Sequence, residues 1–212
     1  MVAQDVRPGL PLAEKLGRVF ISVAGGLARR LRSRCGASSP SLTFPCSPSR
    51  LEDVFSDVVE EQVTYVNAPL FAEQRGLEID LTSDPESPTY PDYVRVCGAM
   101  ADGTQVAVAG TLFGRNQLPR LTEADGFEID LAASGYLLFF VYADRPGVVG
   151  AVGAALGEAR VNIAGAQVSR ADEGGEALMA VTVDTPVGPE LLEEIAGRIG
   201  ARAARAADLT TL

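Results

Sequence analysis

The segment from residue 136 to residue 163, YLLFFVYADRPGVVGAVGAALGEARVNI, constrains the fold more than any other part of the chain. Its apolar run at 137–141 is too short for a helix and rich in aromatic residues, which predicts a buried strand. Small and aliphatic residues then follow for about three helical turns. Because proline is tolerated best at the first position of a helix, Pro146 predicts the helix start, and Gly157 lies near the helix end.

The junction between this strand and this helix has the chemistry of a receptor for an α-amino acid. The first free N–H groups of the helix belong to Gly147, Val148 and Val149, and such a helix N-terminus binds anions, a carboxylate included. Asp144 directly precedes the helix, where its carboxylate can bind an ammonium group. Taken alone, Asp144 could equally be a turn residue, and Asn162 could be a residue that closes its own backbone at a strand start.

The order of elements after residue 135 predicts a ferredoxin-like fold. Strand 136–142, helix 146–159, strands 161–169 and 176–184, helix 188–198 and a last strand near 200–207 give the order βαββαβ. In this order, the loop after the first strand and the start of the second strand lie at opposite ends of the first helix. Asn162 can therefore meet a ligand at Asp144 only through a neighbouring copy or through strand curvature. We expect the ligand at a domain–domain interface.

The part before residue 135 is predicted to be an α/β domain with helices early and antiparallel strands late, so that the whole chain is α+β. The pattern predicts helices over 10–23, 49–59 and 63–75. It predicts strands near 27–35, 77–81, 93–100, 105–113, 119–122 and 127–131. We divide the chain into a tail or linker at 1–9, a first domain at 10–134 and a second domain at 135–212.

Composition argues against several classes of function. The net charge of −10 disfavours nucleic-acid binding, which needs clustered basic residues to neutralise phosphates. The chain has no histidine, and Lys15 is its only lysine, so catalysis within this chain is not expected. Cys35, Cys46 and Cys97 form no CxxC pair and are predicted to be reduced thiols that bind no metal. No apolar stretch is long enough for a membrane span, and we expect a cytoplasmic protein.

Two further patterns invite a functional interpretation, but a structural one is preferred. The glycines of the first helix do not have the dinucleotide-binding spacing G-x-G-x-x-G. We interpret Gly147, Gly150, Gly153 and Gly157 as small residues that let the helix pack closely on its sheet. The basic run 29–34 alternates with other residues, which is typical of the solvated face of an edge strand.

In the loop after the strand 136–142 and at the start of the next strand, the chain resembles an ACT domain, an amino-acid-sensing module of metabolic enzymes. Residues 144–149 match the family pattern D-R-P-G-x-[LV], and Asn162 and Ile163 match the N-I pair that follows the helix. Residues 63–69, 73–76 and 110–114 are similar to the intervening domain of the long bacterial D-3-phosphoglycerate dehydrogenases. The resemblance extends from about residue 10 to 209 and covers only the C-terminal half of those enzymes.

The resemblance implies the regulatory and oligomerisation half of such a dehydrogenase, with L-serine or another small amino acid as feedback effector in L-serine biosynthesis. It puts the carboxylate on residues 147–149 and the ammonium or hydroxyl group on Asp144 and Asn162. The effector-binding residues that it implies are Tyr142, Asp144, Gly147, Val148, Val149, Asn162 and Ile163. Some intervening domains hold a second, basic anion site, for which Arg120 is the candidate here, although residues 126–131 are acidic where those members are basic.

The same resemblance implies partners and cofactors. NAD is expected only on the catalytic half, which would be an oxidoreductase, and this chain is expected to carry no cofactor. Its partners would be a second copy of itself, through pairing of ACT domains, and a catalytic dehydrogenase domain; no nucleic acid or membrane is expected. Two alternatives stay open: a structural dimerisation module that has lost its ligand site, and the β subunit of an iron–sulfur L-serine dehydratase. The β subunits carry a Ser-His-Thr loop, which a chain without histidine lacks.

Overall fold

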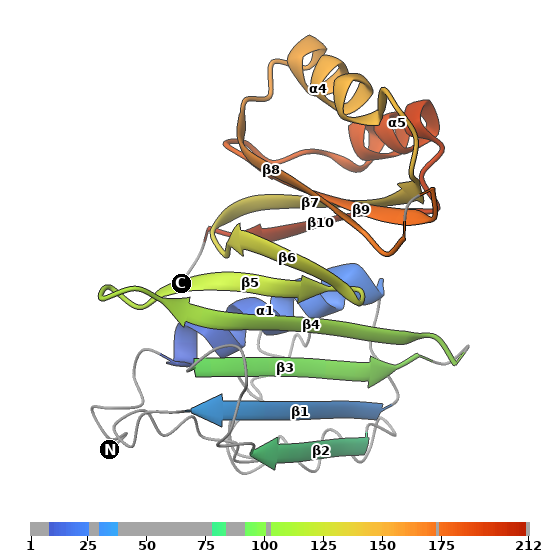
Figure 1. The fold of residues 1–212 in the computed structure, drawn as a ribbon. Coiled ribbons are helices and arrows are strands. Elements are labelled where there is room, and N and C mark those ends of the chain that lie inside the picture. Colours follow the sequence, from blue (N-terminus) through green and yellow to red (C-terminus); the bar gives the residue numbers. More distant parts are fainter. Residues whose placement is uncertain are drawn as a thin grey trace. The chain divides into compact units, whose positions relative to one another are not determined.

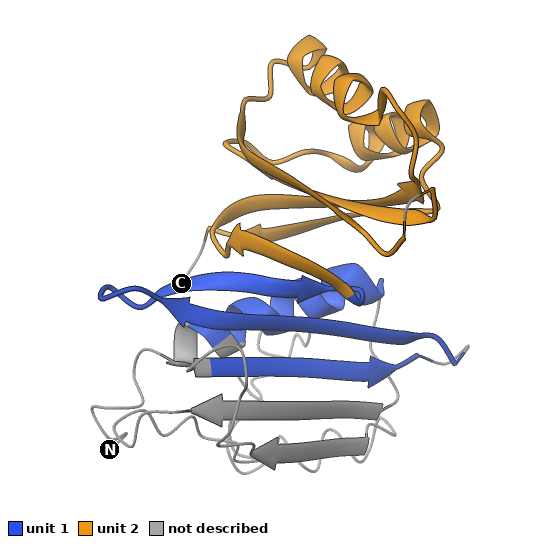
Figure 2. Ribbon diagram, in the orientation of Figure 1, with its two compact units in different colours: residues 1–126 blue, residues 127–212 orange. Residues whose placement is uncertain are grey.

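The computed structural model describes residues 9–25, 30–37, 78–83, 92–100, 103–172 and 174–210. The chain forms two compact units, residues 1–126 and 127–212 (Figure 2). Both combine helices with sheets, which confirms the predicted α+β class. The helices predicted at 49–59 and 63–75, and Cys46, lie outside the described residues.

The first unit contains a mixed sheet with a helix on one face (Figure 1). Its strands lie in the order β2-β1-β3-β4-β5, with β1 and β2 parallel and the other neighbours antiparallel. Leu12, Leu16, Val19 and Phe20 of the helix are buried at the predicted helical spacing. The elements are α1 (Gly9–Ala24), β1 (Arg30–Ala37), β2 (Glu78–Ser83), β3 (Asp92–Ala99), β4 (Gln105–Phe113) and β5 (Leu118–Ala124).

The helix α1 approaches the sheet closely at Gly110 of β4. A Cβ atom at this position would lie 2.6 Å from the backbone oxygen of Arg120 and 3.0 Å from side-chain carbons of Leu12 and Leu16. Real Cβ atoms do not come that close to a backbone oxygen. Glycine is therefore required here, first because the β5 backbone at Arg120 comes so close and second because Leu12 and Leu16 of α1 pack against the same position.

The strand β1 corrects the prediction of an edge strand for the basic run. It pairs with β2 on one side and with β3 on the other. Its register with β2 puts Arg30 opposite Glu78 and Arg32 opposite Asp80. A period of two in the sequence reports alternation between the two faces of a strand but not how many neighbours that strand has.

The second unit has the predicted βαββαβ order from β7 onward. Its antiparallel sheet has the strand order β10-β7-β9-β8, with both helices on one face (Figure 1). Leu138, Phe140, Leu156, Met179 and Ile195 are fully buried between the sheet and the helices. The elements are β6 (Phe127–Ala132), β7 (Gly135–Ala143), α4 (Val148–Glu158), β8 (Ile163–Arg170), β9 (Glu176–Val183), α5 (Pro189–Ile199) and β10 (Ala203–Leu209).

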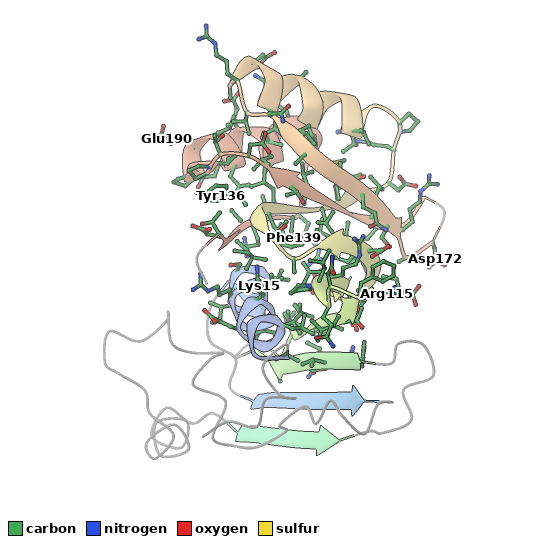
Figure 3. The ribbon with its side chains drawn as sticks, turned by 90° about the vertical axis from the view of Figure 1, so that its left-hand side faces the viewer. Lys15, Arg115, Tyr136, Phe139, Asp172 and Glu190 are labelled. Carbon is green, nitrogen blue, oxygen red and sulfur yellow. The ribbon has the colours of Figure 1, made fainter. Side chains whose placement is uncertain are left out.

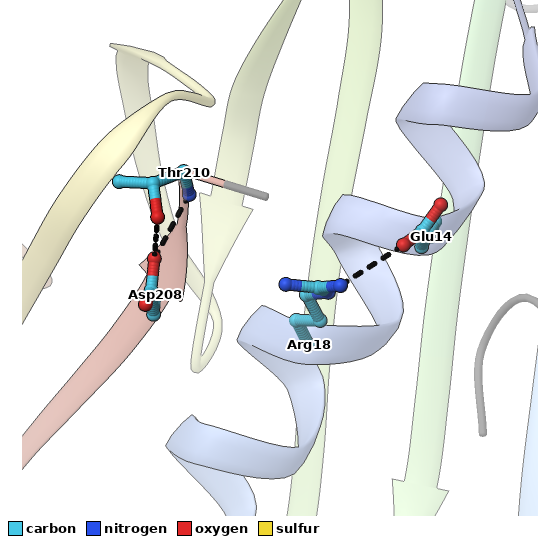
Figure 4. A network of polar contacts seen from close by, with 4 residues as sticks. All are labelled: Glu14, Arg18, Asp208 and Thr210. Atoms are coloured by element: carbon cyan, nitrogen blue, oxygen red, sulfur yellow. Dashed lines mark hydrogen bonds and ion pairs between the residues drawn. The ribbon is translucent and has the colours of Figure 1, made fainter. Parts of the chain in front are cut away.

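Local hydrogen bonds fix several ends and surfaces. Arg18 donates to Glu14 one turn earlier in α1, at 3.1 Å (Figure 4). At the end of β10, Asp208 accepts from both the N–H and the hydroxyl group of Thr210, at 2.9 and 2.6 Å (Figure 4). None of the helices in the described ranges is long and apolar enough to cross a bilayer.

Candidate functional site

The loop between β7 and α4 corrects the predicted helix start. Gly147 is the N-cap of α4, with φ 91° and ψ −12° in the left-handed region. A residue with these angles cannot be part of a right-handed helix, so Pro146 belongs to the preceding turn and Val148 is the first helical residue. Ala151 donates the first intrahelical hydrogen bond, to the oxygen of Gly147 at 3.0 Å. The N–H groups of residues 147–149 come before Ala151 and therefore have no acceptor within the helix. The same holds for the N–H group of Gly150, which was not among the predicted effector-binding residues.

Arg145 anchors this loop to the rest of the unit. Its Nη2 donates to the backbone oxygen of Ile199 at 2.9 Å, at the C-terminal end of α5. A cation at this end of a helix is stabilised by the free carbonyl groups and by the helix dipole. The arginine of the D-R-P-G motif therefore positions the loop, a role that the motif alone did not reveal.

Asp144 lies at the end of β7 with its side chain mostly buried. Its N–H donates to the oxygen of Gly175 at 2.8 Å, and its side chain is 19% exposed. Its Oδ2 lies 3.4 Å from Nε of Arg170, the last residue of β8, whose side chain is 59% exposed. Arg170 is a residue of this site that sequence reasoning missed, because it comes from a different strand.

Tyr142 joins Asp144 and Arg170 in one electrostatic cluster. The strand register places Tyr142 and Arg170 on either side of Ala177, in one row across β7, β9 and β8. Tyr142 is 2% exposed. Burial raises its pKa above the ordinary value, the charge of Asp144 raises it further, and Arg170 opposes the shift. The structure thus brings together Tyr142, Asp144 and Arg170, and Asp144 precedes the N-terminus of α4 in the sequence.

Asn162 and Ile163 lie at the opposite end of the sheet. The side-chain amide of Asn162 donates to Oδ2 of Asp184 at 2.6 Å, and the N–H of Asp184 donates to the backbone oxygen of Asn162 at 3.2 Å. Ile163 pairs with Val183, the last residue of β9. Both predicted residues are exposed.

The length of β9 separates the two halves of the predicted site. Ala143, next to Asp144, pairs with Glu176 at the start of β9, whereas Ile163 pairs with Val183 at its end. These seven residue steps correspond to about 23 Å at about 3.3 Å per residue. One small amino acid cannot contact Asp144 and Asn162 of the same copy.

The glycines of α4 face away from the sheet, so the interpretation that they let the helix pack closely on its sheet is wrong. A Cβ atom added to Gly150, Gly153 or Gly157 would meet nothing within 4 Å. The residues of α4 that face the sheet are its buried ones, Val148, Val152, Ala155 and Leu156. The glycines therefore do not serve close packing on the chain's own sheet, because helical periodicity turns them away from it.

Arg120, the candidate for a second anion site, lies in β5. Its guanidinium carbon is 5.6 Å from the ring centroid of Phe113, within the range of a cation–π contact. It pairs in register with the buried Thr111. An anion site at Arg120 stays a prediction.

The fold defines a ferredoxin-like βαββαβ domain that follows a helix-and-sheet domain in the sequence, and comparisons with known families agree. Residues 136–200 match the ACT domain, and residues 5–125 match the D-3-phosphoglycerate dehydrogenase intervening domain. The latter match covers more than half of the chain. The chain belongs to the D-3-phosphoglycerate dehydrogenase intervening-domain family and carries an ACT domain after it, which confirms the resemblance.

Curated relatives extend well beyond this chain. D-3-phosphoglycerate dehydrogenase of Mycobacterium bovis is 34% identical over 215 residues, which cover 99% of this chain and 40% of the relative. The protein of the same name from Synechocystis sp. is 33% identical, covering 95% of this chain and 36% of the relative. The chain thus spans about 40% of the length of the first of these relatives. A solved formyltetrahydrofolate deformylase from Pseudomonas putida overlaps 34% of the chain at a TM-score of 0.30 and 18% identity, too weak a likeness to argue from.

Proposed function

We propose that this chain is the amino-acid-sensing and pairing part of a D-3-phosphoglycerate dehydrogenase, with L-serine as its feedback effector. One observation carries the proposal: in a matched ACT domain, the mostly buried carboxylate of Asp144 follows β7 and lies three residues before Gly147, where the N-terminal N–H groups of α4 begin. The first group suits an ammonium ion, and the second suits a carboxylate. An α-amino acid carries both on the same carbon.

A second copy of the chain completes this site by simple geometry. β8 is the last strand in its sheet, and it pairs only with β9 among the strands described. Two β8 edges that pair antiparallel about a two-fold axis would bring the start of one strand beside the end of the other. Asn162 of one copy would then approach Asp144 of the other. The two residues could therefore contact the same ligand, although they lie far apart within one copy.

The surface around β8 supports this pairing. Among the described residues of the second unit, the exposed large apolar side chains are those of Val149, Ile163 and Val168, at 57, 38 and 37%. A Cβ atom at the outward glycines of α4 would meet nothing within 4 Å, so a partner helix has room to pack on that face of α4. Exposed apolar groups next to a free strand edge are typical of an interface.

Regulation would follow from linkage between the ligand and the pairing. Serine at the interface would favour one packing of the two copies, and a catalytic dehydrogenase domain joined to them would respond to that packing. Such coupling amounts to about 1–3 kcal/mol in most allosteric proteins. NAD would belong to the catalytic domain, since the sequence of this chain lacks the G-x-G-x-x-G pattern.

The test is a mixing experiment with two variants followed by calorimetry. Asp144→Asn and Asn162→Ala are each expected to abolish binding of L-serine, with D-serine, glycine and valine as ligand controls. An equimolar mixture should regain about a quarter of the sites, because half of the pairs are mixed and each mixed pair has one intact site. Normal binding by Asp144→Asn refutes the site. Binding lost in both variants but not regained on mixing refutes the shared interface, and pairing without binding of any amino acid favours the structural module.

A further inference from the structure

Arg170 and Asp144 present two opposite charges side by side at the end of β7. Nε of Arg170 lies 3.4 Å from Oδ2 of Asp144. The row Tyr142–Ala177–Arg170 puts the arginine on the same side of the sheet as the buried Tyr142, and Ala177 between them is small and fully buried. The hairpin that carries Arg170 turns at Asp172 (Figure 3), where Gly175 donates to the oxygen of Asp172 at 3.1 Å.

We propose that Arg170 is a further effector-binding residue, which binds the α-carboxylate of the amino acid while Asp144 binds its α-ammonium group. This inference rests on the proposed amino-acid site and names a residue that the family pattern does not include. An α-amino acid carries its two charged groups on one carbon, so a zwitterion matches two opposite protein charges that are in direct contact. A guanidinium group is also the side chain best shaped to bind a carboxylate.

The present contact between the two side chains leaves room for this exchange. It joins Nε to Oδ2 and is longer than a good hydrogen bond between charged groups. The terminal nitrogens of a guanidinium form the fork that binds a carboxylate, and a carboxylate has a second oxygen that can accept from an ammonium group. When the zwitterion binds, its carboxylate contacts the terminal nitrogens of Arg170 and its ammonium group contacts Asp144. Asp144 therefore keeps a positive charge beside it.

Arg170 lies at a place where a second anion, besides Asp144, would be stabilised. Asp144 directly precedes the turn into α4, so the guanidinium lies at the end of the unit where α4 begins. The N-terminus of a helix repels a positive charge. Because the Arg170 side chain is 59% exposed, solvent screens its ion pair with the mostly buried Asp144, and this single pair contributes only modestly to stability. A bound carboxylate would be attracted by the guanidinium and by the helix N-terminus together.

The inference restricts the ligands to those with a free α-carboxylate next to a free α-ammonium group. L-serinamide and 2-aminoethanol keep the ammonium and hydroxyl groups of serine but lack the carboxylate charge. The wild-type chain should therefore prefer L-serine strongly over both compounds, and this preference should depend on Arg170.

The experiment is calorimetric titration of the full chain and its variants with L-serine, L-serinamide and 2-aminoethanol. Arg170→Gln should weaken L-serine binding about tenfold or more, the usual size of a lost charged hydrogen bond. It should leave the weak binding of L-serinamide and 2-aminoethanol, which have no carboxylate, unchanged, so that the preference for L-serine is lost. Arg170→Lys keeps the charge and should retain most of that preference.

Arg202→Gln is the matched control. Arg202 is also 59% exposed, and its Nε pairs with Oε1 of Glu176 at 2.8 Å, at the start of β9. Its loss should not change the preference for serine, and the thermal midpoints of both variants should match the wild type. If the wild type binds L-serine and Arg170→Gln binds it equally or more tightly, the inference is wrong while the amino-acid site stands. If the wild type binds no amino acid, the proposed function is wrong and the inference with it.

Discussion

Replacing Gly153 by alanine separates the stability of the α4 helix from its role in pairing. Gly153 lies in the middle of α4, and an added Cβ would meet nothing within 4 Å. A glycine inside a helix costs about 0.5–1 kcal/mol relative to alanine, because it loses more backbone entropy on folding. Gly153→Ala should therefore raise the free energy of unfolding of the unpaired chain by about 0.5–1 kcal/mol.

The same methyl group should weaken pairing if the outward face of α4 contacts a second copy. Filling a close-packed interface usually costs about 1–3 kcal/mol, which corresponds to a rise of about 5- to 150-fold in the dissociation constant of the pair. Urea unfolding at concentrations well below that constant measures the first effect, and sedimentation velocity over a concentration series measures the second.

The two measurements can refute the reasoning separately. An unpaired Gly153→Ala chain that is less stable than the wild type would mean that Gly153 packs within its own chain. A variant that is more stable and pairs as tightly as the wild type would mean that the outward face of α4 is not the interface.

Gly110→Ala should do the opposite of Gly153→Ala, because its Cβ would lie 2.6 Å from a backbone oxygen; we expect a loss of about 1–3 kcal/mol in urea unfolding. Arg95 donates two hydrogen bonds to Glu123, from Nε to Oε2 at 2.6 Å and from Nη2 to Oε1 at 2.7 Å. A double-mutant cycle with alanine at both positions should give a coupling energy of about 1 kcal/mol, because partial exposure of the pair weakens the interaction. Zero coupling would contradict that geometry. The fold raises the pKa of Tyr142 above 10.0, so above this pH the unfolded chain loses the phenolic proton before the folded chain does, and stability falls as the pH rises. Tyr142→Phe should remove that fall between urea curves at pH 9 and pH 11, and an equal fall in the variant would assign it to another group.

The order and type of the elements could be predicted because periodicity reports which face of an element is buried. Leu12, Leu16, Val19 and Phe20 repeat at helical spacing, and the same four side chains pack on the sheet. The βαββαβ order followed in the same way from short apolar runs separated by turn residues. Both signals depend only on residues that are close together along the chain, so they can be read from the sequence alone.

The errors concern properties that depend on neighbours in space or on single dihedral angles. Pro146 is favoured at a first helical position, but the left-handed φ of Gly147 moves the start of α4 to Val148. The pattern of β1 did not show that β2 and β3 flank it on both sides. Arg170 reaches Asp144 through strand register, which a single sequence does not display.

The length of β9 makes sensing and pairing inseparable in the proposed site. Because Asp144 and Asn162 lie about 23 Å apart along this strand, each ligand must bridge two copies, and each pair must bind two ligands. Ligand at about 100 times its dissociation constant stabilises its bound state by about 2.7 kcal/mol per site. Two sites give about 5.4 kcal/mol, so saturating L-serine should lower the dissociation constant of the pair about 10⁴-fold. Sedimentation equilibrium with and without L-serine measures this shift directly. A chain that binds serine while its pairing stays unchanged must hold the whole ligand within one copy. Because Asp144 and Asn162 of one copy are too far apart to contact the same ligand, this result would refute a site that both residues form.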